Sequence, residues 1–453
     1  MLDKPREIAI KTLYKIEKEN AYSNIALDEM IKENRKILEN KDIGFISEIV
    51  YGTITWKLTI DQIIKKHSNI KLKKISVWIL NILRIGIYQI IFLDKVPKSA
   101  AVNESVNLAK RYGHKSSSNF VNAILRKVEK KDYEEFFSVE NDLERISKTT
   151  SMPIWIIEEL LKDNSVEKVE KICKNSNLRP NICIRTNTLK VSKEELKDKL
   201  IKKGIVVEDG MVEAFLIISN VKNIENLSEF KEGLFTIQDE VAGLTAKILN
   251  PKQNEKVLDS CSAPGGKTTF IAELMKNKGN IEAWDIHEHR LDLVKENSKR
   301  LGINIIETKM QDATIFDKEK IEKFDKILLD VPCLGIGVLK RKPDIKWTKT
   351  KENIEEIQKI QMNILNNCSK YLKKGGSLVY STCSIFKSEN IDVVNKFLNE
   401  NSDFEIDIEE FNLLELKTKE FFNKFVKENR YITVYQNEQT DGFFITKLIK
   451  NKR

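Results

Sequence analysis

The sequence predicts a multidomain protein with a helical N-terminal region, a small α+β module and a C-terminal α/β domain. Apolar residues recur at helical spacing over residues 5–130, short strands and helices mix over 151–237, and strands alternate with helices from 238 onward. Such alternation typically produces a parallel, doubly wound sheet. A chain of 453 residues is long enough for roughly two to four domains with their own cores.

The N-terminal region, residues 1–130, is expected to be entirely helical, with its last two helices between about 99 and 128. Its most apolar stretch, Ile75 to Leu93, resembles a membrane span in length but contains Asn81, Arg84 and Gln89. An arginine near the middle of a span costs roughly 2.5–3.5 kcal/mol on insertion scales. We therefore expect a buried helix of a helical bundle and no membrane association.

The positive charge of the chain is concentrated at its N-terminus. Residues 1–130 contain 24 Lys and Arg against 14 Asp and Glu, a net charge of +10, whereas the whole chain carries +9. A basic excess of this kind favours a nucleic-acid partner, although a solvated basic face in a lysine-rich chain is an open alternative. Removal of the residues before Asn141 is then expected to weaken RNA binding and reduce its salt dependence without affecting cofactor binding.

Residues 131–150 are highly charged, and we expect an irregular linker there. The following α+β module, 151–237, should contain two helices, then a strand at NICIRTN, a helix at KEELKDKLIKKG and three short strands. Arg185, Thr186 and Asn187 end the first strand and could contact a phosphate backbone. Ordinary solvated polarity at a strand end is the commoner explanation.

The C-terminal domain, 238–453, is predicted from a regular succession of apolar strands and amphipathic helices. The expected elements are a helix near 239–249, a strand at 256–259, a helix at 267–277, a strand at 281–284, a helix at 287–301, strands at 304–308 and 326–329, a helix at 350–373 and a strand at 377–381. Residues capable of chemistry follow most of these strands. In open parallel sheets ligands bind outside the carboxyl ends of the strands, so these residues should share one edge.

The stretch from Val257 to Thr269, VLDSCSAPGGKTT, is typical of a strand, a tight loop and a helix start that bind a nucleotide-like cofactor. Gly265 and Gly266 would let backbone N–H groups approach the ligand closely. Asp285 lies 26 positions after Asp259 (285 − 259), where an acid can accept hydrogen bonds from ribose hydroxyls, although it could equally cap the next helix. Asp312, after the third strand, could accept from an adenine amino group.

The loop fits neither of the two commonest nucleotide classes. A Walker A loop needs glycine at position 261, which is Cys, and a dinucleotide-binding loop needs G-x-G-x-x-G, which is absent. The strand KILLD at 326–330 does mimic a Walker B strand, so an ATPase is kept as a minor alternative. A nucleoside without pyrophosphate is the remaining choice, which indicates S-adenosylmethionine.

The cysteines argue against a metal site and for thiol chemistry. The six cysteines form no C-x-x-C pair and the four histidines offer no matching spacing, so we expect no metal. The charged N-terminus lacks a signal-like apolar segment, which favours reduced thiols in the cytoplasm. Cys333 and Cys383 each follow an apolar strand, 50 positions apart (383 − 333). The ordinary alternative is that both cysteines are small buried hydrophobic residues without a chemical role.

Several motifs resemble known families. Over residues 238–450 the chain resembles the RNA 5-methylcytosine methyltransferases of the Sun group. The motifs that carry this resemblance are LDSCSAPGGKT, AWDIHEHR, QDAT, LLDVPCLGIGVLKRKPDIKW, VYSTCS and DGFF. The N-terminal region resembles NusB-type RNA-binding helical domains in the segments DKVPKSAAVNESVNLAKRYG and SSSNFVNAILRKV. An ordinary helical bundle that contacts other proteins is an open alternative. The resemblance implies a NusB-like domain at 1–130, a Rossmann-like class I methyltransferase domain at 238–453, and methylation of a cytosine at C5 in bacterial 16S rRNA.

The same resemblance implies roles for individual residues. Cys383 would be the nucleophile that attacks C6 of the cytosine, Cys333 would assist release, and Asp330 would hydrogen-bond the base. S-adenosylmethionine would be bound by Cys261, Ser262, Ala263, Pro264, Gly265, Gly266, Lys267, Asp285, Arg290, Asp312 and Asp330. One departure from the family pattern is Leu334, which stands where serine is common and could loosen the substrate loop.

The expected RNA contacts are basic residues of two regions of the chain. They are Lys340, Arg341 and Lys342 in one region and Arg111, Lys115, Arg126 and Lys127 in the other. We expect a monomer with 16S rRNA as its partner. The alternative from another class is a non-catalytic RNA-binding assembly or antitermination factor with a decayed methyltransferase domain. The argument against decay is that the chemically capable residues are intact, namely Asp259, Asp285, Asp312, Asp330, Cys333 and Cys383. The residues themselves do not indicate the target cytosine or what activates Cys383.

Overall fold

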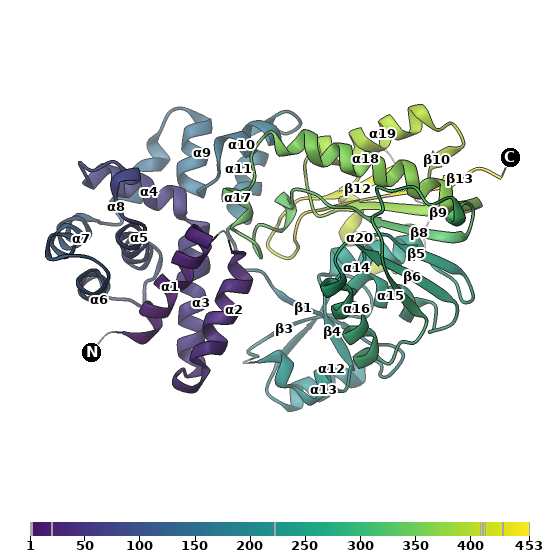
Figure 1. Cartoon of the computed structure of the whole chain (residues 1–453), viewed down its shortest axis with the longest axis horizontal. Helices are drawn as coiled ribbons and strands as arrows, with labels where there is room; N and C mark the ends of the chain where they lie inside the picture. The colour runs from purple at the N-terminus through teal and green to yellow at the C-terminus, as the bar shows by residue number, and fades with distance from the viewer. Residues whose placement is uncertain are drawn as a thin grey trace. The chain divides into compact units, whose positions relative to one another are not determined.

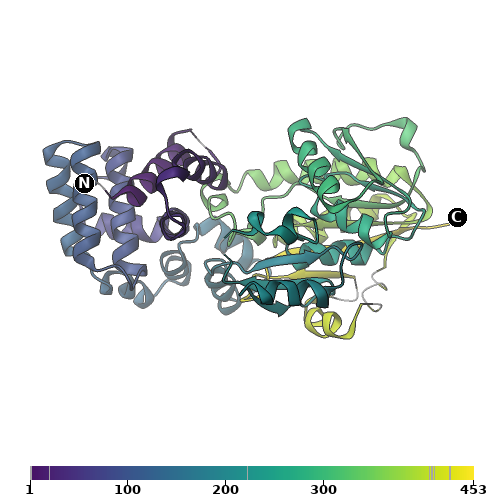
Figure 2. The same cartoon turned by 90° about the horizontal axis from the view of Figure 1, so that it is seen from below.

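A computed structural model describes residues 3–19, 21–221, 223–407, 409, 412, 414–427 and 430–452. The chain forms two compact units. The first comprises Met1–Asn177 together with Leu339–Thr350, and the second comprises Leu178–Val338 together with Lys351–Arg453. Figure 1 and Figure 2 show the helices of the first unit in purple and blue and the sheets of the second in teal, green and yellow.

The first unit is built from helices. Its elements are α1 (Lys4–Glu19), α2 (Ser23–Asn34), α3 (Asn40–Thr55), α4 (Lys57–His67), α5 (Val77–Phe92), α6 (Lys98–Tyr112), α7 (Lys115–Lys127), α8 (Lys131–Glu134), α9 (Asp142–Thr150), α10 (Ile154–Leu161), α11 (Val166–Asn175) and α17 (Ile345–Thr348). The long apolar helix α5 is surrounded by α1, α3, α4, α6 and α7. This arrangement buries nearly every side chain of α5 from Ile79 to Ile91.

Polar residues of α5 explain why this helix can be buried in protein. Arg84 is buried, and its guanidinium donates to Asp61 at 2.7 and 2.8 Å and to Glu17 at 3.0 and 3.1 Å. A buried cation is tolerated when it is paired in this way. The expectation of a buried bundle helix is therefore confirmed. Within the described residues, no helix combines the length and the apolarity that a membrane crossing requires.

The interval 131–150 is not irregular, so that expectation was wrong. It contains α8, a 3₁₀ turn at Glu135–Ser138 and α9. The side chain of Asn141 caps α9 by accepting from the Glu144 N–H at 3.0 Å, and Ile146 is buried on the inner face. Charged residues on the outer face of this short helix conceal its narrow apolar stripe, which explains the error.

The segment Leu339–Thr350 lies far along the chain but packs with the helical unit. Lys346 is buried, and its ammonium donates to the carbonyls of Thr55 and Ser151 at 3.3 and 3.4 Å and to Asn177 Oδ1 at 2.7 Å. The neighbouring Trp347 indole donates to the Ile54 carbonyl at 2.8 Å. A truncation before Asn141 would remove part of this packing surface, so it would alter more than charge.

The second unit begins with a small antiparallel sheet in the order β2-β3-β1-β4. Its elements are β1 (Ile182–Thr186), α12 (Lys193–Lys202), β2 (Val206–Asp209), β3 (Phe215–Ser219), α13 (Ser228–Lys231) and β4 (Phe235–Ile237). The side chains of β1, β3, β4 and α12 form one apolar core that includes Ile184, Leu196, Leu216 and Phe235. These elements follow the strand and helix order expected for the α+β module.

Within the described residues, the rest of the second unit is a sheet of nine strands with its helices, in the strand order β11-β12-β13-β9-β8-β5-β6-β7, with β10 paired to β13. Its strands are β5 (Lys256–Asp259), β6 (Asn280–Asp285), β7 (Ile306–Met310), β8 (Phe324–Asp330), β9 (Leu372–Thr382), β10 (Phe404–Ile406), β11 (Val426–Lys427), β12 (Tyr431–Val434) and β13 (Phe443–Lys450). Strands β5 to β9 pair in parallel, and β13 pairs antiparallel with β9. The sheet is therefore mixed.

The helices of this sheet are α14 (Glu240–Leu249), α15 (Gly266–Leu274), α16 (Glu288–Leu301), α18 (Asn353–Tyr371), α19 (Ile391–Glu400) and α20 (Leu416–Phe422). Two apolar clusters cover the parallel strands, one containing α14 and α15 and the other containing α18 and α19. Figure 1 shows α14, α15 and α16 beside β5 and β6, and α18 and α19 beside β9. The central strands are consequently buried on both faces, which agrees with their continuous apolar sequences.

We predict that Lys346 makes the stability of the chain depend on pH. Burial lowers the pKa of Lys346 from 10.5 to about 7. Between those values the unfolded chain binds the additional proton, so the free energy of unfolding should rise with pH. Lys346→Met removes this contribution. The free energy of unfolding of the wild type, measured by denaturant titration, should therefore rise relative to that of the variant from about pH 7 to about pH 9. Lys342→Met, an exposed position in the same segment, is the control. Parallel pH profiles for wild type and Lys346→Met would contradict this expectation.

Candidate active site at the carboxyl ends of the parallel strands

The parallel register brings the ends of five strands to one edge of the sheet. Asp259 at the end of β5 is opposite Ala283 and Leu328 of its two neighbours, Asp285 of β6 is opposite Met310, and Asp330 of β8 is opposite Ser381. The chain proceeds from β5 to β6 and β7 on one side and to β8 and β9 on the other. The switch point between β5 and β8 is therefore where this fold type binds ligands.

The loop Ser260–Gly266 between β5 and α15 is fixed by contacts from β6 and α16. The Ser262 N–H and hydroxyl donate to the Trp284 carbonyl at 2.8 and 3.0 Å. Arg290 donates to the Ala263 carbonyl at 2.9 Å, and Asn297 donates to the Pro264 carbonyl at 3.0 Å. Gly265 has φ +100°, a conformation that favours glycine. The two glycines of the motif thus permit a tight turn directly ahead of the α15 N-terminus.

Two of the expected cofactor acids already have protein partners. Asp285 forms an ion pair with Arg290 at 3.0 Å and accepts from the His287 N–H at 3.0 Å. The N-cap of α16 is His287 and not Asp285, so the capping interpretation was wrong, and contact with a ligand stays a prediction. Asp312 accepts from the N–H and hydroxyl of Thr314 at 2.8 and 2.7 Å. Both acids lie at the carboxyl ends of neighbouring strands, on the side of β5 away from β8.

Asp259 provides a test of whether this edge suits S-adenosylmethionine. Its Oδ2 accepts from the Thr268 hydroxyl at 2.7 Å, whereas its buried Oδ1 has no hydrogen-bond partner among the described residues. Burial raises the pKa of this carboxyl to about 7. An unpaired buried acceptor calls for a donor. S-adenosylmethionine carries an ammonium group, ribose hydroxyls and an adenine amino group, so the residues present fit this cofactor.

Cys333 and Cys383 lie side by side at this edge, and their sulfur atoms are 2.9 Å apart. Both are partly exposed free thiols. The hydrogen bond with Cys383, together with burial, raises the pKa of Cys333 well above its ordinary value. Neither residue is fully buried, unlike Cys173, Cys183 and Cys368. This proximity of two thiols is instead suited to nucleophilic chemistry.

Asp330 and Lys267 connect the thiols to the cofactor loop. The Lys267 ammonium is 2.8 Å from Asp330 Oδ2, and the Ser381 hydroxyl donates to Asp330 Oδ1 at 3.0 Å. Burial alone would lower the pKa of Lys267, but attraction to Asp330 and to a Cys383 thiolate raises it. Lys267 therefore stays charged near the sulfur of Cys383.

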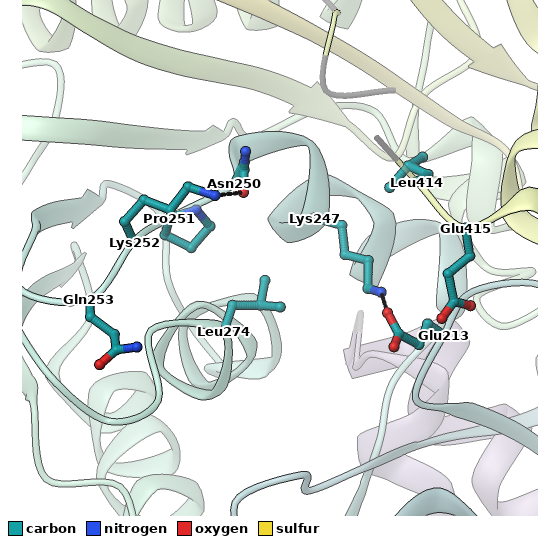
Figure 3. Close-up of a pocket in the computed structure, with 9 residues that line it drawn as sticks. All are labelled: Glu213, Lys247, Asn250, Pro251, Lys252, Gln253, Leu274, Leu414 and Glu415. Carbon is teal, nitrogen blue, oxygen red and sulfur yellow. Dashed lines mark hydrogen bonds and ion pairs between the residues drawn. The ribbon is translucent and has the colours of Figure 1, made fainter. Parts of the chain in front are cut away.

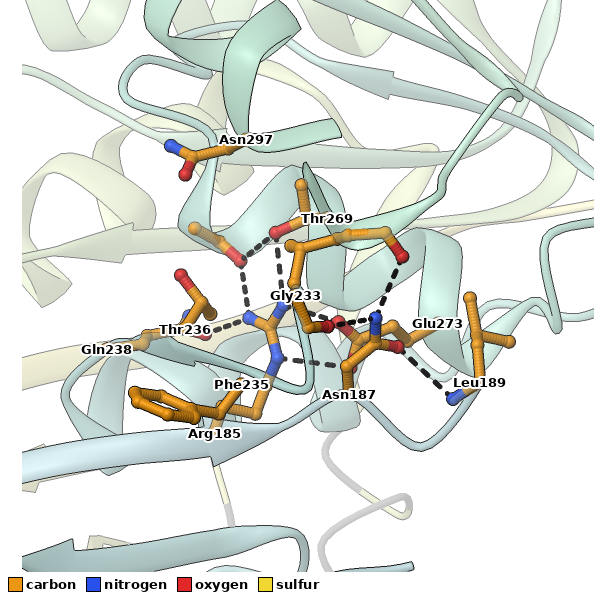
Figure 4. A network of polar contacts seen from close by, with 12 residues as sticks. Arg185, Asn187, Leu189, Gly233, Phe235, Thr236, Gln238, Thr269, Glu273 and Asn297 are labelled. Carbon is orange, nitrogen blue, oxygen red and sulfur yellow. Dashed lines mark hydrogen bonds and ion pairs between the residues drawn. The ribbon is translucent and has the colours of Figure 1, made fainter. Parts of the chain in front are cut away.

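Arg185, Thr186 and Asn187 are fully buried, so neither a phosphate contact nor solvated polarity describes them. The Arg185 guanidinium donates to Glu273 at 2.7 and 3.1 Å and to the Gly266 carbonyl at 2.7 Å (Figure 4). It also donates to the Thr269 hydroxyl at 3.0 Å. Sequence reasoning missed this role, because the partners in α15 lie more than 80 positions away along the chain.

Asn187 makes a second link from the small sheet to the cofactor-binding domain. Its side-chain amide donates to the carbonyls of Gly233 and Leu301 at 2.9 and 2.8 Å. Figure 4 shows Arg185 and Asn187 reaching from the small sheet toward Thr269 and Glu273 of α15. The residue types and their positions in the sequence offered no signal of this role. The structure reveals it through the burial of three successive polar residues.

A surface pocket elsewhere in the second unit does not belong to this edge. It is lined by Glu213, Lys247, Leu274 and Glu415 and by the segment Asn250–Gln253, which precedes β5 (Figure 3). The pocket therefore lies near the amino end of β5, at the opposite edge of the sheet from Asp259. Lys247 and Glu213 form an ion pair across part of it. It contains none of the predicted site residues.

The expected RNA-contact residues all lie in the helical unit. Arg111, Lys115, Arg126 and Lys127 are exposed and lie at the end of α6 and on α7. Lys340, Arg341 and Lys342 belong to the segment Leu339–Thr350 that packs with the same unit. The structure thus groups the two sets in one unit, although they are separated by more than 200 positions in the sequence.

Comparisons with known proteins agree with the domain order. The family described as 16S rRNA methyltransferase RsmB/F matches residues 246–449, the NusB family matches 3–130, and a ferredoxin-like domain of the RsmF/B-like methyltransferases matches 152–225. A protein named probable ribosomal RNA small subunit methyltransferase B, from Bacillus subtilis (strain 168), is 39% identical over 98% of both chains. The chain belongs to the ribosomal RNA small subunit methyltransferase B family.

Other relatives support the same family membership. A ribosomal RNA small subunit methyltransferase B of Shewanella oneidensis is 32% identical over 89% of this chain and 91% of its own. A methyltransferase homolog from Pyrococcus horikoshii, of known crystal structure, is 30% identical, with a TM-score of 0.53 over 65% of this chain and 98% of its own. The crystal structure of PH0851 has a TM-score of 0.79 over 99% of this chain and 100% of its own, at 27% identity. The predicted fold class is thereby confirmed, with the small module identified as ferredoxin-like.

We predict that Arg185 supports cofactor binding through α15. Arg185→Lys keeps the charge but loses the forked geometry that bonds Glu273 and the Gly266 carbonyl together. Because Gly266 ends the cofactor loop, the affinity for S-adenosylmethionine should fall about tenfold, equivalent to about 1.4 kcal/mol. Calorimetric titration of the folded variant measures this loss. Arg179→Lys, an exposed position just before β1, should bind as wild type does. Wild-type affinity in Arg185→Lys would refute this role.

Proposed function

We propose that the chain transfers a methyl group from S-adenosylmethionine to C5 of a cytosine in 16S rRNA, through a covalent adduct with Cys383. The observation that carries this proposal is the pair of thiols, 2.9 Å apart, at the same sheet edge as the cofactor loop. The family profile and the names of the relatives support 16S rRNA as the substrate class. When bound, S-adenosylmethionine supplies an electrophilic methyl group.

The chemistry of cytosine explains why a thiol is needed. C5 of cytosine is too electron-poor to attack a methyl group directly. Addition of the Cys383 thiolate to C6 converts C5 into an enamine-like carbon that can accept the methyl group. A general base then removes the C5 proton, and the released electron pair restores the C5–C6 double bond as the C6–sulfur bond breaks and the Cys383 thiolate leaves.

Lys267 and Asp330 are suited to support the first step. A free thiol is only a few per cent ionised near neutral pH, so a nearby cation is needed to favour the thiolate. The attraction between Lys267 and a Cys383 thiolate is one cause of the raised pKa of Lys267. Asp330 holds this ammonium at 2.8 Å and would hydrogen-bond the cytosine at N3 and N4. The Lys267 ammonium is therefore our candidate for the group that activates Cys383.

Cys333 is suited to the release step rather than to the attack. Its pKa is well above the ordinary value, because of the hydrogen bond with Cys383, burial and the charges of Cys383, Glu389 and Asp330. A thiol that stays protonated is a poor nucleophile but can exchange a proton with an adjacent sulfur. The resemblance to the Sun group implies the same division of roles.

The helical unit is proposed to bind the RNA backbone. The exposed side chains of Arg111, Lys115, Arg126 and Lys127 support this role, and the match to the NusB family agrees with it. Each phosphate neutralised by such a residue steepens the fall of log affinity with log salt by roughly 0.7 to 0.9. The segment with Lys340, Arg341 and Lys342 is proposed to contribute further phosphate contacts.

Methyl transfer to ribosomal RNA tests the proposed reaction. The protein should transfer labelled methyl from S-adenosylmethionine to rRNA from a strain that lacks the gene, and bisulfite sequencing should locate the product at one cytosine of 16S rRNA. A Cys333→Ser, Cys383→Ser double variant is the control and should transfer nothing. No label in rRNA or in small-subunit particles would favour the rival, a non-catalytic RNA-binding assembly factor.

The two cysteines should give different single-variant phenotypes. Cys383→Ser should abolish methylation without forming an adduct, because the attacking thiolate is absent. Cys333→Ser should still attack but release poorly, so protein linked to RNA should accumulate and persist on denaturing gels. An adduct with Cys383→Ser in place of Cys333→Ser would reverse the assigned roles.

A further inference from the structure

A buried carboxylate connects the two turns that bear the cysteines. Glu389 is fully buried and lies at the end of a 3₁₀ turn, Lys387–Glu389, six positions after Cys383 (389 − 383). Its Oε2 accepts from the backbone N–H of Leu334 at 2.8 Å, and its Oε1 accepts from the Ser384 hydroxyl at 2.5 Å. Leu334 directly follows Cys333, and Ser384 directly follows Cys383. One side chain therefore bonds the next residue after each sulfur.

Gln361 of α18 completes the hold on the Cys333 turn. It is fully buried, and its side-chain N–H group donates to the Pro332 carbonyl at 2.9 Å and to Glu389 Oε2 at 3.4 Å. Pro332 directly precedes Cys333. The residues on both sides of Cys333 are thus bound to the same Gln361–Glu389 pair.

Asn390 makes the corresponding contacts on the Cys383 turn. Its Oδ1 accepts from the Thr382 hydroxyl at 2.6 Å, and its amide donates to the Ser384 carbonyl at 3.1 Å. The Cys383 carbonyl itself accepts from the Gly337 N–H at 2.8 Å, which joins this turn to the segment after Cys333. A Cβ on Gly337 would lie 2.6 Å from that carbonyl oxygen, so the close approach requires glycine.

We propose that Glu389 is a positioning residue that holds the Cys333 and Cys383 turns at a fixed separation and keeps the two sulfurs in different roles. This inference rests on the proposed two-cysteine reaction. Geometry supports the first part, because a single carboxylate can fix two turns only if both of its oxygen atoms are engaged. The departure at Leu334 does not weaken this contact, because the bond to Glu389 uses the backbone N–H.

Charge supports the second part of the proposal, that Glu389 keeps the two sulfurs in different roles. The groups that face Cys333 and disfavour its ionisation are Cys383, Glu389 and Asp330. Glu389 bonds the residue after each cysteine, and its negative charge is one cause of the raised pKa of Cys333. Lys267, in contrast, is a cation that interacts by charge with Cys383. The two sulfurs therefore have neighbours of opposite charge.

Two substitutions separate geometry from charge. Glu389→Gln removes the charge but keeps an oxygen for the Leu334 N–H and an amide for Ser384, whose hydroxyl can also accept. Glu389→Asp keeps the charge but is one methylene shorter and cannot reach both turns. Glu240→Gln and Glu240→Asp are matched controls, since Glu240 is a buried carboxylate that accepts from the N–H groups of Met211 and Val212.

The spacing of the sulfurs can be measured without RNA. Diamide oxidises two adjacent thiols to a disulfide and is itself reduced to a hydrazine, so the rate of Cys333–Cys383 disulfide formation reports their positions. Glu389→Asp should slow this reaction and lower kcat by up to about 10²-fold with an unchanged KM for S-adenosylmethionine. Glu389→Gln should react with diamide as wild type does or faster. If Glu389→Asp forms the disulfide at the wild-type rate and has the wild-type kcat, the positioning role is overturned.

The charge effect is read from alkylation of each cysteine with iodoacetamide, followed by mass spectrometry across a pH series. Glu389→Gln should shift the alkylation profile of Cys333 to lower pH. An unshifted Cys333 profile would overturn the role of the charge. Equal losses of stability and activity in the Glu389 and Glu240 variants, with unchanged thiol reactivity, would reduce Glu389 to a structural residue. Because the thiol measurements need no substrate, they remain decisive even if the proposed methylation fails.

Discussion

The hydrogen-bond register of five parallel strands is the constraint on which the rest of this protein depends. The register aligns the ends of β5, β6 and β8, so that Asp259, Asp285 and Asp330 share one edge. A shift of one residue in any strand would turn its terminal acid to the other face of the sheet. The apolar clusters on both faces of the sheet resist such a shift, because each face needs its own set of side chains. Burial of the core and alignment of the chemistry thus have the same physical cause.

Buried polar groups connect this edge to the remainder of its unit. Arg185 links the small sheet to the helix that follows the cofactor loop, and Glu389 links the two cysteine turns. Each group is expensive to bury, and the expense is offset only while all of its partners remain in place. These two side chains are therefore sensitive to small displacements, which suits them to hold the neighbouring loops in fixed positions.

The helical unit shows a related use of burial at a distance in sequence. Lys346 is surrounded by two carbonyl oxygens and an amide oxygen from α3, the end of α9 and the end of α11. These three oxygen atoms carry no formal charge, and burial lowers the pKa of the amine. A segment that follows Cys333 by only a few residues thereby belongs to the unit that carries the exposed basic residues of α6 and α7.

Most of the candidate site could be predicted from the sequence because it depends on local patterns. The motif at Val257–Thr269 combines a strand, a positive-φ glycine and a helix start, and the structure contains all three. Apolar strands such as 326–329 and 377–381 were located to within a few residues, since their periodicity is a local property. The irregular interval assigned to 131–150 failed because a short helix offers too few turns for its apolar face to stand out.

The sequence by itself indicated the candidate residues for chemistry and the strand that each one follows. Only the tertiary structure decided which of them meet, because side-chain partners such as Arg185 and Glu273 or Glu389 and Leu334 come together through strand pairing and packing. The sequence gives no distance between Cys333 and Cys383, whereas the adjacent strands β8 and β9 bring their sulfurs to 2.9 Å. The burial of Lys346 was equally beyond reach, since long-range burial depends on the whole chain and not on neighbouring residues.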